Sequence, residues 1–186
     1  MTSFAELRAA ARDFLLRHAA GGVVIVAEHR QAADELAFEV CPGVLTGVER
    51  YGFREFVHRA ARDAVRRRGL TAVSHLVREA IAARVAAATE LTRLREAATF
   101  PGFPRALTDT LEDLRLNRRA AEGDLGLLAE AYDAELDARG FAGHALRVEL
   151  ARDAVGAADS PFRGKAIVLL DAAVRSAAER ALAGAL

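Results

Sequence analysis

The sequence predicts a helix-rich α/β fold in which a small parallel sheet carries a large, all-helical insertion. Two short apolar runs, at 23–27 and 166–170, each lead into a helical pattern. Neither run alternates apolar with polar residues, which is typical of strands covered on both faces in a parallel sheet. Amphipathic helical patterns fill the chain between them, from about 70 to 155. A purely helical bundle that buries both apolar runs is the alternative fold.

Length and charge limit the possible functions. The chain has 186 residues, enough for a single domain with its own core. The formal net charge is zero, so bulk charge predicts neither a nucleic-acid nor a membrane partner. No apolar run approaches the roughly 18 residues that span a bilayer. Cys41 is the only cysteine, so no intrachain disulfide or multi-cysteine metal site is expected. With no signal peptide, this favours the cytoplasm.

The α/β part is expected to comprise residues 1–69 and 156–186. Thr2 or Ser3 can cap a first helix, whose apolar face includes Phe4 and Leu15. The elements expected after it are the strand at 23–27, a helix through Val40 that Cys41–Gly43 breaks, a short strand at 45–48, and an amphipathic helix from Gly52 to Arg68. Near the end of the chain, a loop through Gly164 precedes the strand at 166–170 and a final helix from about Ala173.

The insertion at 70–155 is expected to contain several helices. The pattern is helical from Thr71 to about Thr99, as one long helix or two with a kink. Phe100–Pro104 is the strongest break in the chain, because it holds two prolines and a glycine. The helices expected after it end near Asn117, run from Glu122 to Arg139, and run from Phe141 to Val155.

The single lysine tests for two kinds of active site. Lys165 follows Gly164 but precedes an apolar run, whereas a P-loop lysine follows a strand. Position 163 is arginine, so a Glu-x-Lys nuclease signature is also missing. Asp171 ends a strand, where a Walker B aspartate would hold magnesium, but Ala172 follows it in place of glutamate. We therefore expect Lys165 to lie in a solvated loop and Asp171 to cap the last helix. No catalytic residue, nucleotide site, cofactor or metal site is predicted.

Arginine is concentrated between residues 49 and 68, where seven arginines accompany only three acidic residues. Arginine suits phosphate contacts because its guanidinium donates two parallel hydrogen bonds. A solvated face that pairs with the acidic stretch Glu122–Asp137 is the alternative interpretation. Glu28, His29 and Arg30 follow the first strand, where α/β sheets bind ligands.

Four segments, in order, resemble a known family. The sequence VIVAEHRQAADEL at 24–36 resembles motif Ia of UvrD-type superfamily 1 helicases. It is more similar still to the degenerate motif of AddB-type helicase–nuclease subunits. The segments at 47–56, at 100–107 with 111–115, and at 166–171 resemble the family's next strand–helix unit, its helical subdomain and its motif II strand.

The resemblance implies a P-loop-helicase-like fold whose P-loop is missing. It implies the N-terminal domain of a protein that processes DNA ends in repair or recombination, with a PD-(D/E)XK nuclease further along a longer parent. The chain has His29 where motif Ia has threonine, Gln31 where it has lysine, and Ala172 where motif II has glutamate. ATP hydrolysis is therefore not expected, and this chain is not expected to be catalytic itself.

On this interpretation, His29, Arg30, Arg50 and Arg54 are the residues expected to contact DNA, as single strands or ends. An AddA-like helicase or the missing downstream domains would be the protein partners, and no membrane partner is expected. A second hypothesis is a helical protein-interaction or structural module that binds no nucleic acid. A third is a residual nucleotide-binding domain that uses Asp171.

Overall fold

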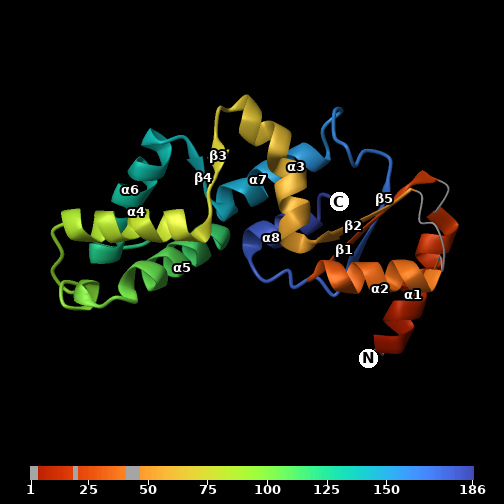
Figure 1. Cartoon of the computed structure of the whole chain (residues 1–186), viewed down its shortest axis with the longest axis horizontal. Helices are drawn as coiled ribbons and strands as arrows, with labels where there is room; N and C mark the ends of the chain where they lie inside the picture. The colour runs from red at the N-terminus through yellow and green to blue at the C-terminus, as the bar shows by residue number, and fades with distance from the viewer. Residues whose placement is uncertain (1–3, 19–20, 41–46) are drawn as a thin grey trace.

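The computed structural model describes residues 4–18, 21–40 and 47–186. Figure 1 shows two lobes side by side, joined by a pair of very short strands. We call residues 75–138 the helical lobe and the part that holds the three-stranded sheet the α/β lobe. The predicted class, α/β and helix-rich with a small parallel sheet, is confirmed. Within the described ranges, no helix is both long enough and apolar enough to cross a bilayer.

The main sheet has three parallel strands, in the order β2, β1, β5. The central strand β1 (Val23–Ala27) is buried along its whole length, as its unbroken apolar run predicts. Its neighbours are β5 (Ala166–Leu170) and β2 (Val48–Gly52). The predicted strand at 45–48 was therefore placed too early, and residues 45 and 46 lie outside the described part of the chain. The edge strand β2 is only half-buried, so it tolerates polar residues and lacks an apolar run that would reveal it.

Helices cover both faces of β1. The odd-numbered residues of β1 pack with α1 (Phe4–His18) and α2 (Arg30–Val40). Its even-numbered residues pack with α3 (Phe53–Arg67), α7 (His144–Val155) and α8 (Ala177–Ala183). Because side chains alternate across a strand, this two-sided cover explains why β1 is apolar throughout. The N-cap expected at Thr2 or Ser3 and the break at Cys41–Gly43 lie outside the described residues.

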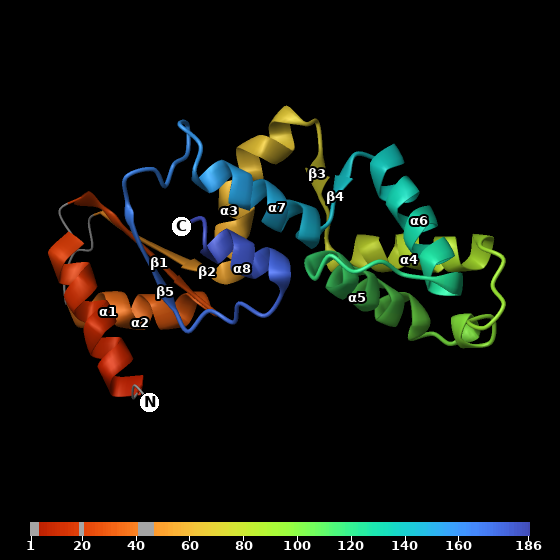
Figure 2. The same ribbon diagram turned by 180° about the vertical axis from the view of Figure 1, so that it is seen from behind.

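Helix α7 belongs to the α/β lobe, although the sequence places it in the insertion. Val148, Ala151 and Val155 are buried in the same cluster as Val24 of β1. Figure 2 shows α7 beside α3, and α8 packs against α7. The block of separately packed helices thus ends near residue 138 and not at 155. Helical periodicity predicts that α7 has an apolar face, but it does not indicate which lobe covers that face.

The helical lobe has its own core, with Leu111, Leu128 and Tyr132 among its buried residues. It consists of α4 (His75–Ala88), the 3-10 turn η2 (Ala97–Thr99), α5 (Phe103–Leu116) and α6 (Gly123–Ala138).

The helix expected over 71–99 is wrong at both ends. Ser74 caps α4 by accepting the Val77 N–H at 3.4 Å, so the helix begins only at His75. After Ala88 the chain leaves the helix, and the Asp124 carboxylate accepts backbone N–H groups of this segment, including that of Leu94 at 2.7 Å. The Asp124 contacts compete with the helical hydrogen-bond pattern after Ala88.

A two-stranded parallel ladder joins the lobes. Strand β3 (Thr71–Ala72) pairs with β4 (Phe141–Ala142) where the chain enters and leaves the helical lobe. The helix predicted from Phe141 therefore starts three residues later, at His144. The pairing holds the helical lobe next to the carboxyl ends of the main strands (Figure 1).

Candidate functional site

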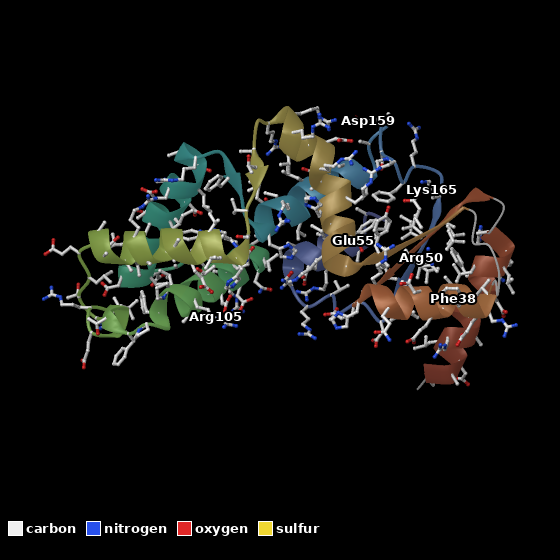
Figure 3. The ribbon with its side chains drawn as sticks, in the orientation of Figure 1. Phe38, Arg50, Glu55, Arg105, Asp159 and Lys165 are labelled. Carbon is white, nitrogen blue, oxygen red and sulfur yellow. The ribbon has the colours of Figure 1, made fainter. Side chains whose placement is uncertain are left out.

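A cleft of about 970 Å³ lies between the lobes, at the carboxyl edge of the main sheet. Residues that follow each main strand line it: Glu28 after β1, Phe53 after β2 and Ala173 after β5. The helical lobe supplies the opposite wall, mostly from α5. Figure 3 shows Glu55 at the start of α3 and Arg105 on α5, which line the cleft from the two lobes. Open α/β sheets bind ligands at this edge.

Four helices begin at the cleft. Their first turns carry the lining residues Arg30 of α2, Phe53 of α3, His75 of α4 and His144 of α7. The N-caps of α3 and α7 are glycines, so neither helix is capped by a side chain of its N-cap residue. The first N–H groups of a helix lack partners within the helix, and its N-terminal end carries a partial positive charge. The cleft is therefore suited to anions.

Three of the four residues predicted to contact DNA line the cleft, namely His29, Arg30 and Arg54. Arg50 is not among the lining residues, because it lies within β2 and its guanidinium pairs with Asp34 of α2 at 3.3 Å. Arg30 also has a partner, since it donates to Glu55 at 2.9 Å. Arg54 has no carboxylate partner among the described residues.

Four further arginines line the cleft that the sequence alone did not single out: Arg78, Arg105, Arg147 and Arg175. They come from α4, α5, α7 and the segment before α8. The sequence contains no signal that groups them, because they are 27 or more residues apart and belong to separate amphipathic patterns.

Charges in the cleft are balanced by number but not by pairing. The lining contains six arginines and six carboxylates: Arg30, Arg54, Arg78, Arg105, Arg147 and Arg175, with Glu28, Glu55, Asp109, Glu112, Asp113 and Glu179. Five of the carboxylates are already bonded within the protein. Only two of the bonded ones pair with cleft arginines. Within the described residues, four cleft guanidinium groups therefore lack a carboxylate partner.

We call the part of the cleft that is lined by Arg54, Arg78, Glu112, His144 and Arg147 its inner wall. Glu112 on α5 is the acidic residue of this wall. Its carboxylate accepts from the Arg78 guanidinium of α4 and, at 2.5 Å, from the Ala145 N–H of α7. The two charged side chains are only 10% and 15% exposed, so water screens them poorly. The Nε of Arg78 is buried and has no hydrogen-bond partner among the described residues. Glu112 therefore joins the lobes while satisfying Arg78 only in part.

Cations crowd this wall. Burial lowers the pKa of Arg147; Glu112 opposes the shift, and the positive charges of Arg78 and Arg54 add to it. Burial likewise lowers the pKa of His144, which Glu112 opposes and Arg147 and Arg54 reinforce. His144 is therefore neutral at pH 7, whereas the arginines stay charged because a guanidinium loses its proton only at very high pH.

The expected role of Asp171 is wrong, and Lys165 lies in a loop before β5 as expected but is not solvated. Ser176, not Asp171, caps α8, in a capping box with Glu179. Asp171 lies outside the cleft lining, in a left-handed backbone conformation with φ of 45°. Lys165 is half-buried and pairs with Glu49 across the sheet, so it is not a solvated loop residue.

The basic helix α3 does not form the ion pairs expected with residues 122–137. Arg67 pairs instead with Asp159 at 3.0 Å. Acidic side chains of α6 pair with Arg84 of α4 and Arg115 of α5. Only the first turn of α3, with Arg54, reaches the cleft.

No known protein-family model matches the chain, and comparison with curated proteins finds no relative. Among the described residues, no group of three or more histidine, cysteine, aspartate or glutamate side chains is arranged to hold a metal ion. Any proposal for the function must therefore rest on the cleft and on the sequence resemblance.

Proposed function

We propose that the cleft binds the phosphate backbone of DNA, as single strands or ends. The chain would be the non-catalytic, helicase-like domain of an AddB-like protein that processes DNA ends in repair or recombination. One observation carries the proposal: within the described residues, four cleft arginines without carboxylate partners lie beside the first turns of four helices at the carboxyl edge of a parallel sheet. Guanidinium groups and helix N-termini are the groups that most often donate hydrogen bonds to phosphate in proteins.

The lining also predicts how DNA would be held. Among the described residues that line it, Phe53 is the only phenylalanine, tyrosine or tryptophan, and Phe53 is 5% exposed. Proteins that stack bases present exposed aromatic rings, and these are missing from the lining. We therefore propose binding through phosphates, which is independent of base sequence. An AddA-like helicase or downstream domains of a longer chain are the proposed protein partners. The single cysteine favours a reducing location such as the cytoplasm.

The proposal is tested with a fluorescently labelled oligothymidine, by anisotropy between about 50 and 200 mM salt. Each phosphate contact on a single strand contributes about −0.7 to the slope of log K against log salt, so four free arginines predict a slope of about −3. Arg54→Gln combined with Arg105→Gln should reduce it to about −1.4, because two contacts are lost.

The matched control is Arg66→Gln combined with Arg93→Gln. It removes the same charge, with one exposed arginine from each lobe, outside the cleft lining. Arg66 is on the same helix as Arg54 but about 18 Å away along the axis, from a rise of 1.5 Å per residue. This control should keep both affinity and slope. Equal weakening by the two double variants, or no binding at the lowest salt, would contradict the proposal and favour the protein-interaction module.

A further inference from the structure

We propose that the inner wall of the cleft, where Arg54 and Arg147 lie beside the ion pair of Arg78 and Glu112, is a subsite for a phosphate monoester. On the proposed function, on which this inference rests, the monoester is the terminal phosphate of a DNA strand. All four residues line the cleft, and they come from α3, α7, α4 and α5 respectively.

Charge on this wall favours a monoester over an internal phosphodiester. Of its three arginines only Arg78 pairs with a carboxylate, so within the described residues Arg54 and Arg147 are two positive charges without an ion-pair partner. A phosphate monoester carries about −1.5 to −2 near neutral pH, with three acceptor oxygens. An internal phosphodiester carries a single negative charge and would leave one cation unpaired. His144 adds no charge, since its lowered pKa keeps it neutral, but its ring can donate a hydrogen bond.

Burial makes the unpaired charge costly without a ligand. The Arg78 side chain is 10% exposed, and its Nε has no acceptor within the described residues. Each oxygen of Glu112 already accepts one hydrogen bond, from Arg78 and from the Ala145 N–H, and Arg147 forms no ion pair with this carboxylate. Arg147 is therefore a partly buried cation without a carboxylate partner among the described residues, and an anion bound beside it would relieve the cost of its burial.

The N-terminus of α7 adds to the same wall. Its N-cap is Gly143, which has no side chain to cap the helix, and Arg147 in the second turn donates to the Gly143 carbonyl at 3.3 Å. The positive end of the helix dipole therefore points into a corner already rich in guanidinium groups. The arginine cluster and the positive end of the α7 dipole, where Glu112 accepts the Ala145 N–H, favour the same ligand chemistry.

The test compares three oligothymidines of equal length, carrying a 5′-phosphate, a 3′-phosphate or hydroxyl groups at both ends. At one salt concentration, an oligonucleotide with a terminal phosphate should bind at least about tenfold more tightly, because it gains a charge-assisted hydrogen bond. Comparing the 5′ and 3′ forms identifies the end that occupies the subsite. Equal affinity of all three would overturn the subsite while leaving backbone binding intact.

Variants locate the subsite. Arg147→Gln should lower the affinity ratio of phosphorylated to unphosphorylated oligonucleotide to below about twofold, since it removes a donor to the phosphate. Arg54→Gln is a second, exposed variant with the same expected effect and little risk to folding. Arg105→Gln, two turns before Glu112 on α5 and outside the subsite, should weaken all three oligonucleotides and keep their ratio. A ratio unchanged by both Arg147→Gln and Arg54→Gln would overturn the location.

A measurement without DNA separates the subsite from the proposed function. Inorganic phosphate should raise the Tm above that in sodium chloride of equal ionic strength, and Arg147→Gln should abolish the difference. A phosphate effect without oligonucleotide binding would keep the subsite as a small-phosphate site and reject the DNA role. Equal Tm in phosphate and chloride, together with no oligonucleotide binding, would reject both.

Discussion

Replacing Glu112 with glutamine should destabilise the junction between the lobes. The Glu112 carboxylate holds Arg78 of the helical lobe and the Ala145 N–H at the start of α7 in the α/β lobe. Glutamine has nearly the same shape, and its amide oxygen can still accept one of these hydrogen bonds. It carries no charge, so Arg78 becomes a buried cation with no counterion.

The magnitude follows from the burial of the pair. Removing one partner of a buried ion pair costs about 3–5 kcal/mol, because the remaining charge stays desolvated. The two side chains are 10% and 15% exposed, and glutamine retains one acceptor, so we expect about 3 kcal/mol, the lower end of that range. For a chain of this length, that lowers the Tm by about 6–12 °C. Adding Arg78→Met removes the orphaned charge and should restore stability to within about 1 kcal/mol of the wild type.

Thermal and urea unfolding, followed by circular dichroism, measure these differences. The control is Glu130→Gln, an exposed glutamate on α6 outside the cleft lining, which should change stability by no more than about 0.5 kcal/mol. The reasoning is refuted if Glu112→Gln behaves like this control. It is also refuted if the double variant with Arg78→Met is as unstable as Glu112→Gln alone.

Three further predictions concern the α/β lobe. Burial raises the pKa of Glu49, but hydrogen bonds from Lys165 and Tyr51 lower it by more, to below its ordinary value of 4.5. The ionised Glu49 carboxylate therefore stabilises the fold above pH 4.5, and this stabilisation is lost as the pH falls through its pKa in the folded chain. In that pH range, the free energy of unfolding in urea should depend less on pH for Glu49→Gln than for the wild type. Gly52→Ala would place a Cβ 3.3 Å from the backbone nitrogen of Arg30. It should lower the free energy of unfolding in urea by about 1 kcal/mol and weaken oligothymidine binding. Unchanged stability would show that the backbone at this turn shifts without cost. Burial is the main cause that raises the pKa of Tyr51 to about 12, and the Glu49 carboxylate adds to it. Ultraviolet absorbance between pH 10 and 12 should therefore show less tyrosinate in the folded chain than in the unfolded one. Coincident titration curves of the two states would disprove this.

Elements with strong local signals could be predicted from the sequence alone. The run at 23–27 predicted a strand buried on both faces, and β1 is that strand. The apolar stripe of α3 predicted that helix to within about a residue at each end. These predictions succeed because the spacing of apolar residues within a segment indicates which of its faces must be buried. That information is local to the segment.

Elements that depend on a distant partner could not be predicted in this way. Strand β2 has polar residues and becomes a strand by pairing with β1, from Val48 opposite Val23 to Gly52 opposite Ala27. Helix α7 has an ordinary amphipathic pattern, and only packing on α3 places it in the α/β lobe. An amphipathic pattern identifies an apolar face but not the element that covers it.

The candidate site divides in the same way. The sequence by itself located His29 and Arg30 at a strand end and Arg54 in the first turn of a helix, and all three line the cleft. The sequence also grouped Arg50 with these residues, but Arg50 does not line the cleft. It lies within β2, two residues before the strand ends, and its side chain pairs with Asp34. Only the tertiary structure brought in the arginines of the opposite wall and of α7.

The inner wall shows the physical reason. Arg78 and Glu112 are 34 residues apart, and Glu112 and Ala145 are 33 apart. Their contacts exist only because the β3–β4 ladder sets one lobe against the carboxyl edge of the other. Local sequence thus determined the strands, the helices and the types of side chain available. The packing of the lobes decided which charges meet, and so where an anion can bind.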